Sequence, residues 1–215
     1  MRVVIADDHG IVREGLRSLL DKQPDVEVVG EGEDGQMAVQ LAESLSPDIV
    51  IMDMSMPNLN GIEATRLILG HNPRIRVIIL SMHSDRQIVK ETLEAGASAY
   101  VQKTHLFDEM RRALEAVAEG GRYLSPRITD VILNDYVGRP SEGESAEAPK
   151  LTGRERRIVQ LIAEGKTIKE IARVLHISPK TADTNRRQIM NKLNISSVAE
   201  LTKYALREGL TSLEF

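Results

Sequence analysis

Residues 48–61 have the sequence DIVIMDMSMPNLNG, and this stretch decides the fold. Four apolar residues lead up to Asp53, and the polar segment after it contains Pro57 and ends at Gly61. A short apolar run bounded by turn residues is typical of a strand buried within a parallel sheet. Because open α/β sheets place their chemistry at the carboxyl ends of their strands, Asp53 is predicted to lie at a functional edge.

Similar apolar runs recur through the first 119 residues. They occupy residues 3–6, 26–30, 77–80 and 99–101. Stretches with apolar residues three and four positions apart separate them and predict helices. The alternation predicts a doubly wound α/β domain with five parallel strands, and right-handed crossovers bring the carboxyl ends of these strands to one edge. The polar residues expected there are Asp7, Asp8, Asp53, Ser81 and Lys103.

The composition excludes several classes of protein. The 215 residues include no cysteine, so a disulfide framework, a thiol nucleophile and a cysteine-bound zinc are all excluded. No apolar run approaches the roughly 20 residues of a membrane-spanning helix, and the N-terminus soon becomes too acidic for a signal peptide. We therefore expect a cytoplasmic protein with no membrane partner.

The charge is unevenly distributed along the chain. Residues 150–215 carry 13 Lys and Arg against 7 Asp and Glu, whereas the remaining residues carry 15 against 25. The net charges of +6 and −10 suggest two parts with different tasks, and the basic part suits a polyanion. Ordinary variation in surface charge is the alternative.

The spacing of Gly, Pro and Ser predicts where the domains begin and end. Residues 138–149 are polar and rich in these three residue types, which is typical of a flexible linker, and apolar residues in 126–137 predict a helix before it. We expect one domain over residues 1–121, a linker over 122–149 that is first helical and then flexible, and a second domain over 150–215.

The second domain is predicted to be all-α with four helices. Thr152 and Glu155 have capping-box spacing at the start of the first helix, which extends to about residue 163. The second helix is expected over 168–175. Ser178 and Pro179 suit the N-cap and first position of a third helix that ends near residue 193. The fourth is expected over 198–207.

The ordered set of polar residues in the first domain resembles the receiver domain of bacterial response regulators. The resemblance implies a flavodoxin-like fold in which Asp53 accepts a phosphoryl group from a sensor histidine kinase. It also implies Mg²⁺ (or Mn²⁺) held by Asp7, Asp8, Asp53 and the backbone carbonyl of Ser55. Singly, Asp8 also suits a helix cap and Lys103 a solvated surface; their joint position favours the site.

The same resemblance assigns roles to three further residues. Lys103 is expected to pair with the phosphoryl oxygens. Ser81 and Tyr100 are the expected switch pair: Ser81 donates a hydrogen bond to the phosphoryl group, and Tyr100 turns toward the space vacated. Thr104 departs from the family pattern, because many receivers have proline after the lysine.

Residues 151–210 resemble the LuxR-type helix-turn-helix, so the whole chain is similar to the NarL/FixJ group of response regulators. The third helix is expected to enter the major groove of double-stranded DNA. Thr184 and Arg187 are expected nearest the bases, with Asn191 on the same face. The expected phosphate contacts are Lys180, Arg186, Lys192 and Arg173. The family pattern Val-Glu-x-His is replaced here by Ala-Asp-Thr-Asn at residues 182–185.

Two questions stay open at this level. Val198, Leu201, Ala205 and Leu206 in the fourth helix fit either a dimer contact, as in the family, or the core of the domain. The favoured function is a DNA-binding regulator that dimerises when Asp53 is phosphorylated. The alternatives are a constitutive DNA-binding regulator whose receiver serves only as a dimerisation or partner module, and a phosphatase, in which the helix-turn-helix has no place.

Overall fold

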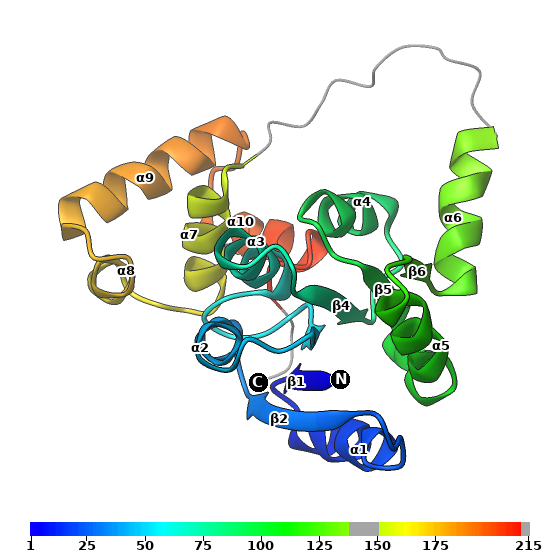
Figure 1. Ribbon diagram of the computed structural model, residues 1–215. Coiled ribbons are helices and arrows are strands. Elements are labelled where there is room, and N and C mark those ends of the chain that lie inside the picture. The colour runs from blue at the N-terminus through cyan, green and yellow to red at the C-terminus, as the bar shows by residue number, and fades with distance from the viewer. Residues whose placement is uncertain (138–150, 212–215) are drawn as a thin grey trace. The chain divides into compact units, whose positions relative to one another are not determined.

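The computed structural model describes residues 1–137 and 151–211 (Figure 1). The chain divides into two compact units, Met1–Pro140 and Ser141–Phe215. The flexible linker that the sequence predicts over residues 138–149 lies outside the described residues. Within the described part of the chain, no helix is both long and apolar enough to cross a membrane.

The first unit contains a parallel sheet with the strand order β2-β1-β3-β4-β5-β6. The strands are β1 (Arg2–Ala6), β2 (Glu27–Gly32), β3 (Ile49–Asp53), β4 (Arg76–Ser81), β5 (Ala99–Gln102) and β6 (Tyr123–Leu124). The five predicted strands and the doubly wound order are confirmed. The sheet has one strand more than predicted, because β6 has only two residues and shows no apolar run of its own.

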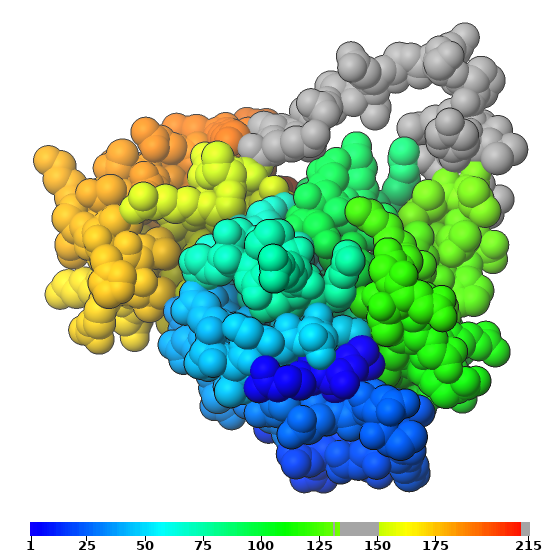
Figure 2. Space-filling model, viewed as in Figure 1, coloured from blue at the N-terminus to red at the C-terminus, as the bar shows by residue number. Residues whose placement is uncertain are grey.

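Helices cover both faces of this sheet. Alternate residues of each strand point to opposite faces, so β1 sends Val3 and Ile5 to one face and Val4 and Ala6 to the other. The first face packs against α1 (Gly10–Leu20) and α5 (Leu106–Ala118), which form part of the surface in Figure 2. The second packs against α2 (Gly35–Leu45), α3 (Gly61–His71) and α4 (Arg86–Glu94).

The residues after α5 belong to the first unit as far as they are described. β6 pairs with β5, and α6 (Pro126–Val137) packs against α4. Ile128 of α6 is fully buried in the same apolar cluster as Ile88 of α4 and Tyr100 of β5. The start of the predicted linker is therefore a packed helix that contacts the sheet domain.

The second unit is all-helical, as predicted. Its helices are α7 (Gly153–Ala163), α8 (Ile168–Val174), α9 (Pro179–Lys192) and α10 (Val198–Arg207). The capping box of Thr152 and Glu155 is present, and Ser178 caps α9 with Pro179 at its first position. His176, in the left-handed region at φ 52°, makes the turn between α8 and α9.

Candidate functional site

The predicted acidic residues meet at the carboxyl edge of the sheet. Asp53 is the last residue of β3, Asp7 directly follows β1, and Lys103 directly follows β5. β1 lies beside β3, and β4 separates β3 from β5. Because the strands are parallel and in register, their ends place these three side chains around one small space.

Lys103 links the two buried carboxylates. Its Nζ lies 2.9 Å from Asp7 Oδ2 and 3.0 Å from Asp53 Oδ1. The side chain of Asp7 is fully buried, that of Asp53 is 5% exposed, and that of Lys103 is 13% exposed. Such burial is tolerated because the charges are paired.

The pocket shifts the pKa of both Asp53 and Lys103. Burial raises the pKa of the Asp53 carboxyl from 3.8 to about 6; Lys103 opposes this rise, and the charges of Asp7 and Asp8 add to it. Burial disfavours the charged form of Lys103, but Asp53 and Asp7 outweigh burial and raise the pKa of its ammonium group. A cation and a carboxylate with a raised pKa thus lie within ion-pair distance.

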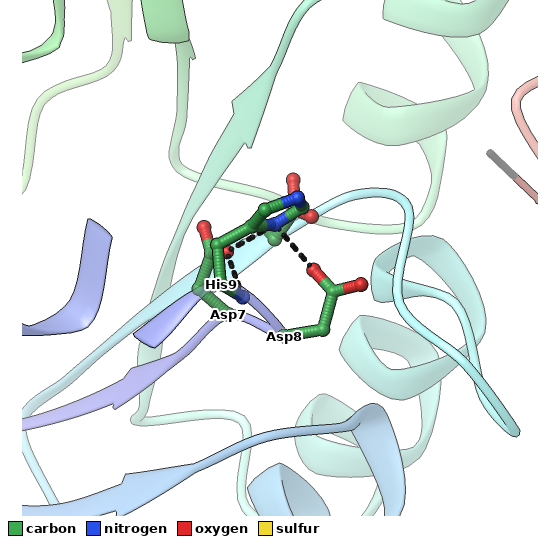
Figure 3. Close-up of side chains that lie close together, drawn as sticks. Asp7, Asp8 and His9 are labelled. Atoms are coloured by element: carbon green, nitrogen blue, oxygen red, sulfur yellow. Dashed lines mark hydrogen bonds and ion pairs between the residues drawn. The ribbon is translucent and has the colours of Figure 1, made fainter. Parts of the chain in front are cut away.

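His9 is a member of this cluster that the sequence reasoning missed. Its Nδ1 lies 2.8 Å from Asp8 Oδ1 and 3.1 Å from Asp7 Oδ1, and its backbone N–H donates to Asp7 Oδ1 at 3.0 Å (Figure 3). The available signal was its position directly after the acidic pair, at the same strand end. It orients the carboxylate of Asp7 from the side opposite Lys103.

The donor set fits a hard divalent cation. One ligand atom from each of Asp7, Asp8, His9 and Asp53 lies within 4.8 Å of the others. Mg²⁺ prefers oxygen ligands and keeps several waters, so the three carboxylates suit it better than the imidazole does. Asp8 is half-buried, which leaves the cluster open to solvent on its side.

Gly61 allows the loop after Asp53 to fold back on that residue. A Cβ at Gly61 would lie 2.3 Å from the Asp53 backbone oxygen and 3.0 Å from Met54 Cα. The Gly61 N–H donates to the Met54 carbonyl at 2.8 Å, which closes the loop. Gly61, the last residue of the stretch 48–61, is therefore required because two backbone segments approach each other closely beneath the site.

Ser81 and Tyr100 are both buried on adjacent strands. The Ser81 hydroxyl lies 3.6 Å from Met54 Sδ and accepts a hydrogen bond from the His83 N–H at 3.0 Å. The Tyr100 hydroxyl donates to the His83 carbonyl at 3.0 Å, and burial raises the pKa of this phenol to about 12. The backbone of His83 thus links the two residues. Tyr100 is fully buried.

The exposed face of α9 carries the residues predicted to contact DNA. Ala182 and Ile189 are fully buried in the core of the second unit, with Met190 and Leu193 partly buried against it, as the helix pattern predicts. The predicted residues that are exposed are Lys180, Thr184, Arg187, Asn191 and Lys192 on α9 and Arg173 on α8. α8 packs against α9, so Arg173 lies on the helix next to the one that carries the other five residues.

Three of the predicted cations are paired with acidic side chains of the unit. Asp183 accepts hydrogen bonds from Nε and an amino group of Arg186, and its other oxygen lies 2.7 Å from Arg187. The side chain of Arg186 is 29% exposed, whereas that of Arg187 is 72% exposed. Lys192 Nζ lies 2.8 Å from Glu155 Oε2. Arg187 therefore has the most accessible side chain of these charged residues.

Some of the apolar residues of the fourth helix, α10, lie in the domain core and others are exposed. Leu201 and Ala205 are fully buried in the core of the second unit, where α10 packs against α7. Val198, at 44% exposed, lies outside that core. The core role therefore holds for Leu201 and Ala205, and a dimer contact would use the exposed side of α10.

Two family models match this chain. The model described as the response regulator receiver domain matches residues 3–115, and the model described as bacterial regulatory proteins of the luxR family matches residues 149–205. The matched residues include the whole acidic cluster and all of α7, α8 and α9.

Curated relatives are similar over nearly the whole chain. The transcriptional regulatory protein LiaR of Bacillus subtilis is 39% identical over 212 residues, which cover 99% of this chain and 100% of the relative. The transcriptional regulatory protein DegU of Brevibacillus brevis is 35% identical and covers 97% of this chain and 94% of the relative. Both names describe regulators of transcription and not enzymes.

The fold is also that of solved structures. RcsB from Salmonella enterica serovar Typhimurium, solved bound to the promoter rprA with the phosphomimetic BeF3⁻, matches with a TM-score of 0.67 at 28% identity. That match covers 95% of this chain and 97% of the RcsB chain. With an acidic receiver pocket and a LuxR-type helix-turn-helix in one chain, the protein belongs to the NarL/FixJ group of two-component response regulators and is a DNA-binding regulator of transcription.

Proposed function

We propose that Asp53 is the phosphorylation site of this regulator and takes its phosphoryl group from a cognate sensor histidine kinase. The observation that carries the proposal is the convergence of Asp53, Asp7 and Lys103 within ion-pair distance at one sheet edge. Phosphoryl transfer depends mainly on positioning and charge stabilisation, and this edge supplies both. In this proposal the receiver comprises residues 1–121, the linker residues 122–149, of which 123–137 are packed on the receiver as β6 and α6, and the DNA-binding domain residues 150–215.

In the transfer, an Asp53 carboxylate oxygen attacks phosphorus. The new O–P bond forms as the N–P bond to the kinase histidine breaks, and the histidine leaves with the electron pair of that bond. With its pKa raised to about 6, Asp53 remains largely ionised at neutral pH and available as a nucleophile. Lys103 holds Asp53 Oδ1 before transfer and pairs with the phosphoryl oxygens afterwards.

The carboxylates of Asp7, Asp8 and Asp53, with the backbone carbonyl of Ser55, are the proposed ligands of Mg²⁺ or Mn²⁺. The cation supplies charge neutralisation that lets an anionic phosphoryl group approach three carboxylates. Asp8 faces the cluster from its exposed side, and His9 keeps the carboxylate of Asp7 oriented. Ser81 and Tyr100 are the proposed switch residues, which respond to the phosphoryl group through the His83 peptide.

The proposed output is binding of double-stranded DNA through α9. The exposed Thr184 and Arg187 are the proposed contacts to base edges, with Asn191 proposed on the same face. The proposed phosphate contacts are Lys180, Arg186, Lys192 and Arg173. Arg186 and Lys192 are paired with acidic side chains, and each has further N–H donors that a phosphate can accept from.

Phosphorylation is proposed to control dimerisation and hence DNA affinity in the cytoplasm. A phosphoryl group adds about −1.5 to −2 charges and new acceptor oxygens, which shifts the equilibrium between receiver conformations. The alternative from the sequence, a constitutive regulator whose receiver is only a dimerisation or partner module, does not use the paired acid and lysine at the sheet edge. We therefore favour the phosphorylation-controlled regulator.

Labelling with acetyl phosphate tests the acceptor. The wild-type protein should incorporate about one phosphoryl group per chain with Mg²⁺, and little in the presence of EDTA. Asp53→Ala should incorporate none, whereas Asp21→Ala, which changes an exposed aspartate outside the cluster, should incorporate normally. Normal labelling of Asp53→Ala would eliminate the proposed acceptor.

A further inference from the structure

Ser125 joins three elements of the first unit at one residue. It directly precedes α6, and its carbonyl accepts the first hydrogen bonds of that helix, from Ile128 at 2.8 Å and Thr129 at 3.0 Å. Its backbone N–H donates to the carbonyl of Tyr100 on β5 at 3.0 Å. The residue is fully buried, so these bonds are shielded from water.

The side chain of Ser125 is used differently from the threonine and serine side chains that cap the four helices of the second unit. The hydroxyls of Thr152, Thr167, Ser178 and Ser197 each accept a backbone N–H of their own helix. The Ser125 hydroxyl instead accepts the N–H of Gln102 at 2.9 Å and donates to the carboxylate of Glu109 on α5. The Ser125 hydroxyl therefore links the residue before α6 to the end of β5, and it does not cap α6.

The end of β5 is one of the three strand ends that form the proposed phosphorylation site, with those of β1 and β3. Gln102 directly precedes Lys103, whose ammonium group holds Asp53, and Tyr100 is the proposed switch residue. Ser125 thus bonds to β5 on both sides of Val101, at Tyr100 and at Gln102. A shift of β5 toward or away from Asp53 would be transmitted to Ser125 by two hydrogen bonds.

The apolar contacts of α6 also connect it to β5. Ile128 is buried in one cluster with Tyr100, Ile88 and Val89, so α6 rests on α4 and β5. Figure 1 shows α6 beside β6 at the end of the sheet. α6 is also the last described helix before α7, the first of the DNA-binding unit.

From these contacts we infer that Ser125, oriented by Glu109, is the positioning residue that couples the state of the Asp53 site to α6 and thereby to the DNA-binding domain. The inference rests on the proposed phosphorylation of Asp53 and adds the route by which it is read out. Glu109 fixes the hydroxyl so that it accepts from Gln102, and the carbonyl of Ser125 carries any displacement into the first turn of α6.

The test compares full-length variants on DNA. The probe is the duplex that phosphorylated wild-type protein selects from a random-sequence library, and the measured quantity is the factor by which acetyl phosphate and Mg²⁺ raise affinity for it. Ser125→Ala should still be labelled at Asp53. Its affinity ratio, which is the affinity of the phosphorylated protein divided by that of the unphosphorylated protein, should be about threefold to tenfold lower than that of the wild type. This is the effect of losing one or two buried hydrogen bonds. A purely structural role would weaken both phosphorylation states alike and leave the ratio unchanged.

Ser44→Ala is the control, because the Ser44 hydroxyl donates only to carbonyls of its own helix α2, at Gln40 and Leu41, and α2 is not part of the contacts among α4, β5 and α6. Its affinity ratio should equal that of the wild type. Glu109→Ala should lower the ratio as Ser125→Ala does, and the double variant should be no worse than either single one, because both act at one joint. Ser125→Thr, which keeps the hydroxyl, should restore the ratio.

The outcomes separate this inference from the function on which it rests. Labelling of Ser125→Ala with an unchanged affinity ratio, or additive effects in the double variant, overturns the coupling role alone. Failure of the wild-type protein to be labelled at Asp53 overturns the proposed function instead. If Ser125→Ala is not labelled because it is misfolded, Glu109→Ala decides the question by the same ratio.

Discussion

Replacing Asp53 with asparagine should stabilise the metal-free protein, although it destroys the proposed phosphorylation site. Burial raises the pKa of Asp53 from 3.8 to about 6, so the ionised carboxylate is unfavourable in the folded state. A shift of about two units, at about 1.4 kcal/mol each, gives a cost of about 3 kcal/mol. Asparagine occupies a similar volume and never ionises.

The stability of the wild type should fall with rising pH because of Asp53. A carboxyl whose folded-state pKa lies above its unfolded value binds its proton more tightly when folded, so the wild type loses stability as pH rises from 3.8 to about 6. The stability difference between Asp53→Asn and wild type should be near zero below this window and about 3 kcal/mol at neutral pH. Mg²⁺ should reduce it, because a neighbouring cation favours the carboxylate.

Urea denaturation in EDTA at several pH values measures this difference directly. Asp21→Asn, which changes an aspartate that is 59% exposed, is the control and should alter stability by less than about 0.5 kcal/mol throughout. If Asp53→Asn is no more stable than wild type at neutral pH, or if the difference does not change between pH 4 and pH 7, the description of Asp53 as a buried, destabilised carboxylate is wrong.

Three further substitutions test other parts of the account. Gly61→Ala should lower the unfolding free energy by about 1–3 kcal/mol and slow phosphoryl incorporation, because the added Cβ would clash with the Asp53 backbone. The control Gly70→Ala, which adds a Cβ in open space on α3, should unfold at no lower a temperature than wild type. Tyr100→Phe should cost about 0.5–1.5 kcal/mol in urea, since the His83 carbonyl loses its donor; an unchanged midpoint would contradict this bond. Arg187→Ala should weaken binding to the selected duplex by about 1–3 kcal/mol in a fluorescence titration, and equal affinity would remove Arg187 from the interface.

The sequence was sufficient for the architecture because its signals are local and strong. Asp53 follows an apolar strand and precedes a Gly-terminated loop, so its position at the sheet edge follows from strand topology alone. The helix starts at Thr152 and Ser178 were equally predictable, since capping residues act on their own helix.

The parts that were missed depend on contacts between distant segments. β6 has two residues and exists only by pairing with β5, so no pattern in it predicts a strand. His9 was overlooked because its role depends on the direction in which its ring turns toward Asp7 and Asp8. The bonds of Ser125 to Gln102 and Glu109 span 23 and 16 residues, and local sequence carries no signal for them.

DNA affinity before and after phosphorylation of Asp53 measures the coupling between the two domains most directly. The full-length protein is treated with acetyl phosphate and Mg²⁺ and titrated against the selected duplex, with Asp53→Ala treated identically. Phosphorylation should raise the affinity of the wild type by about 5-fold to 150-fold, the usual range of allosteric coupling, and should not change that of Asp53→Ala. Equal affinity of phosphorylated and unphosphorylated wild type would contradict this coupling and favour a constitutive DNA-binding regulator.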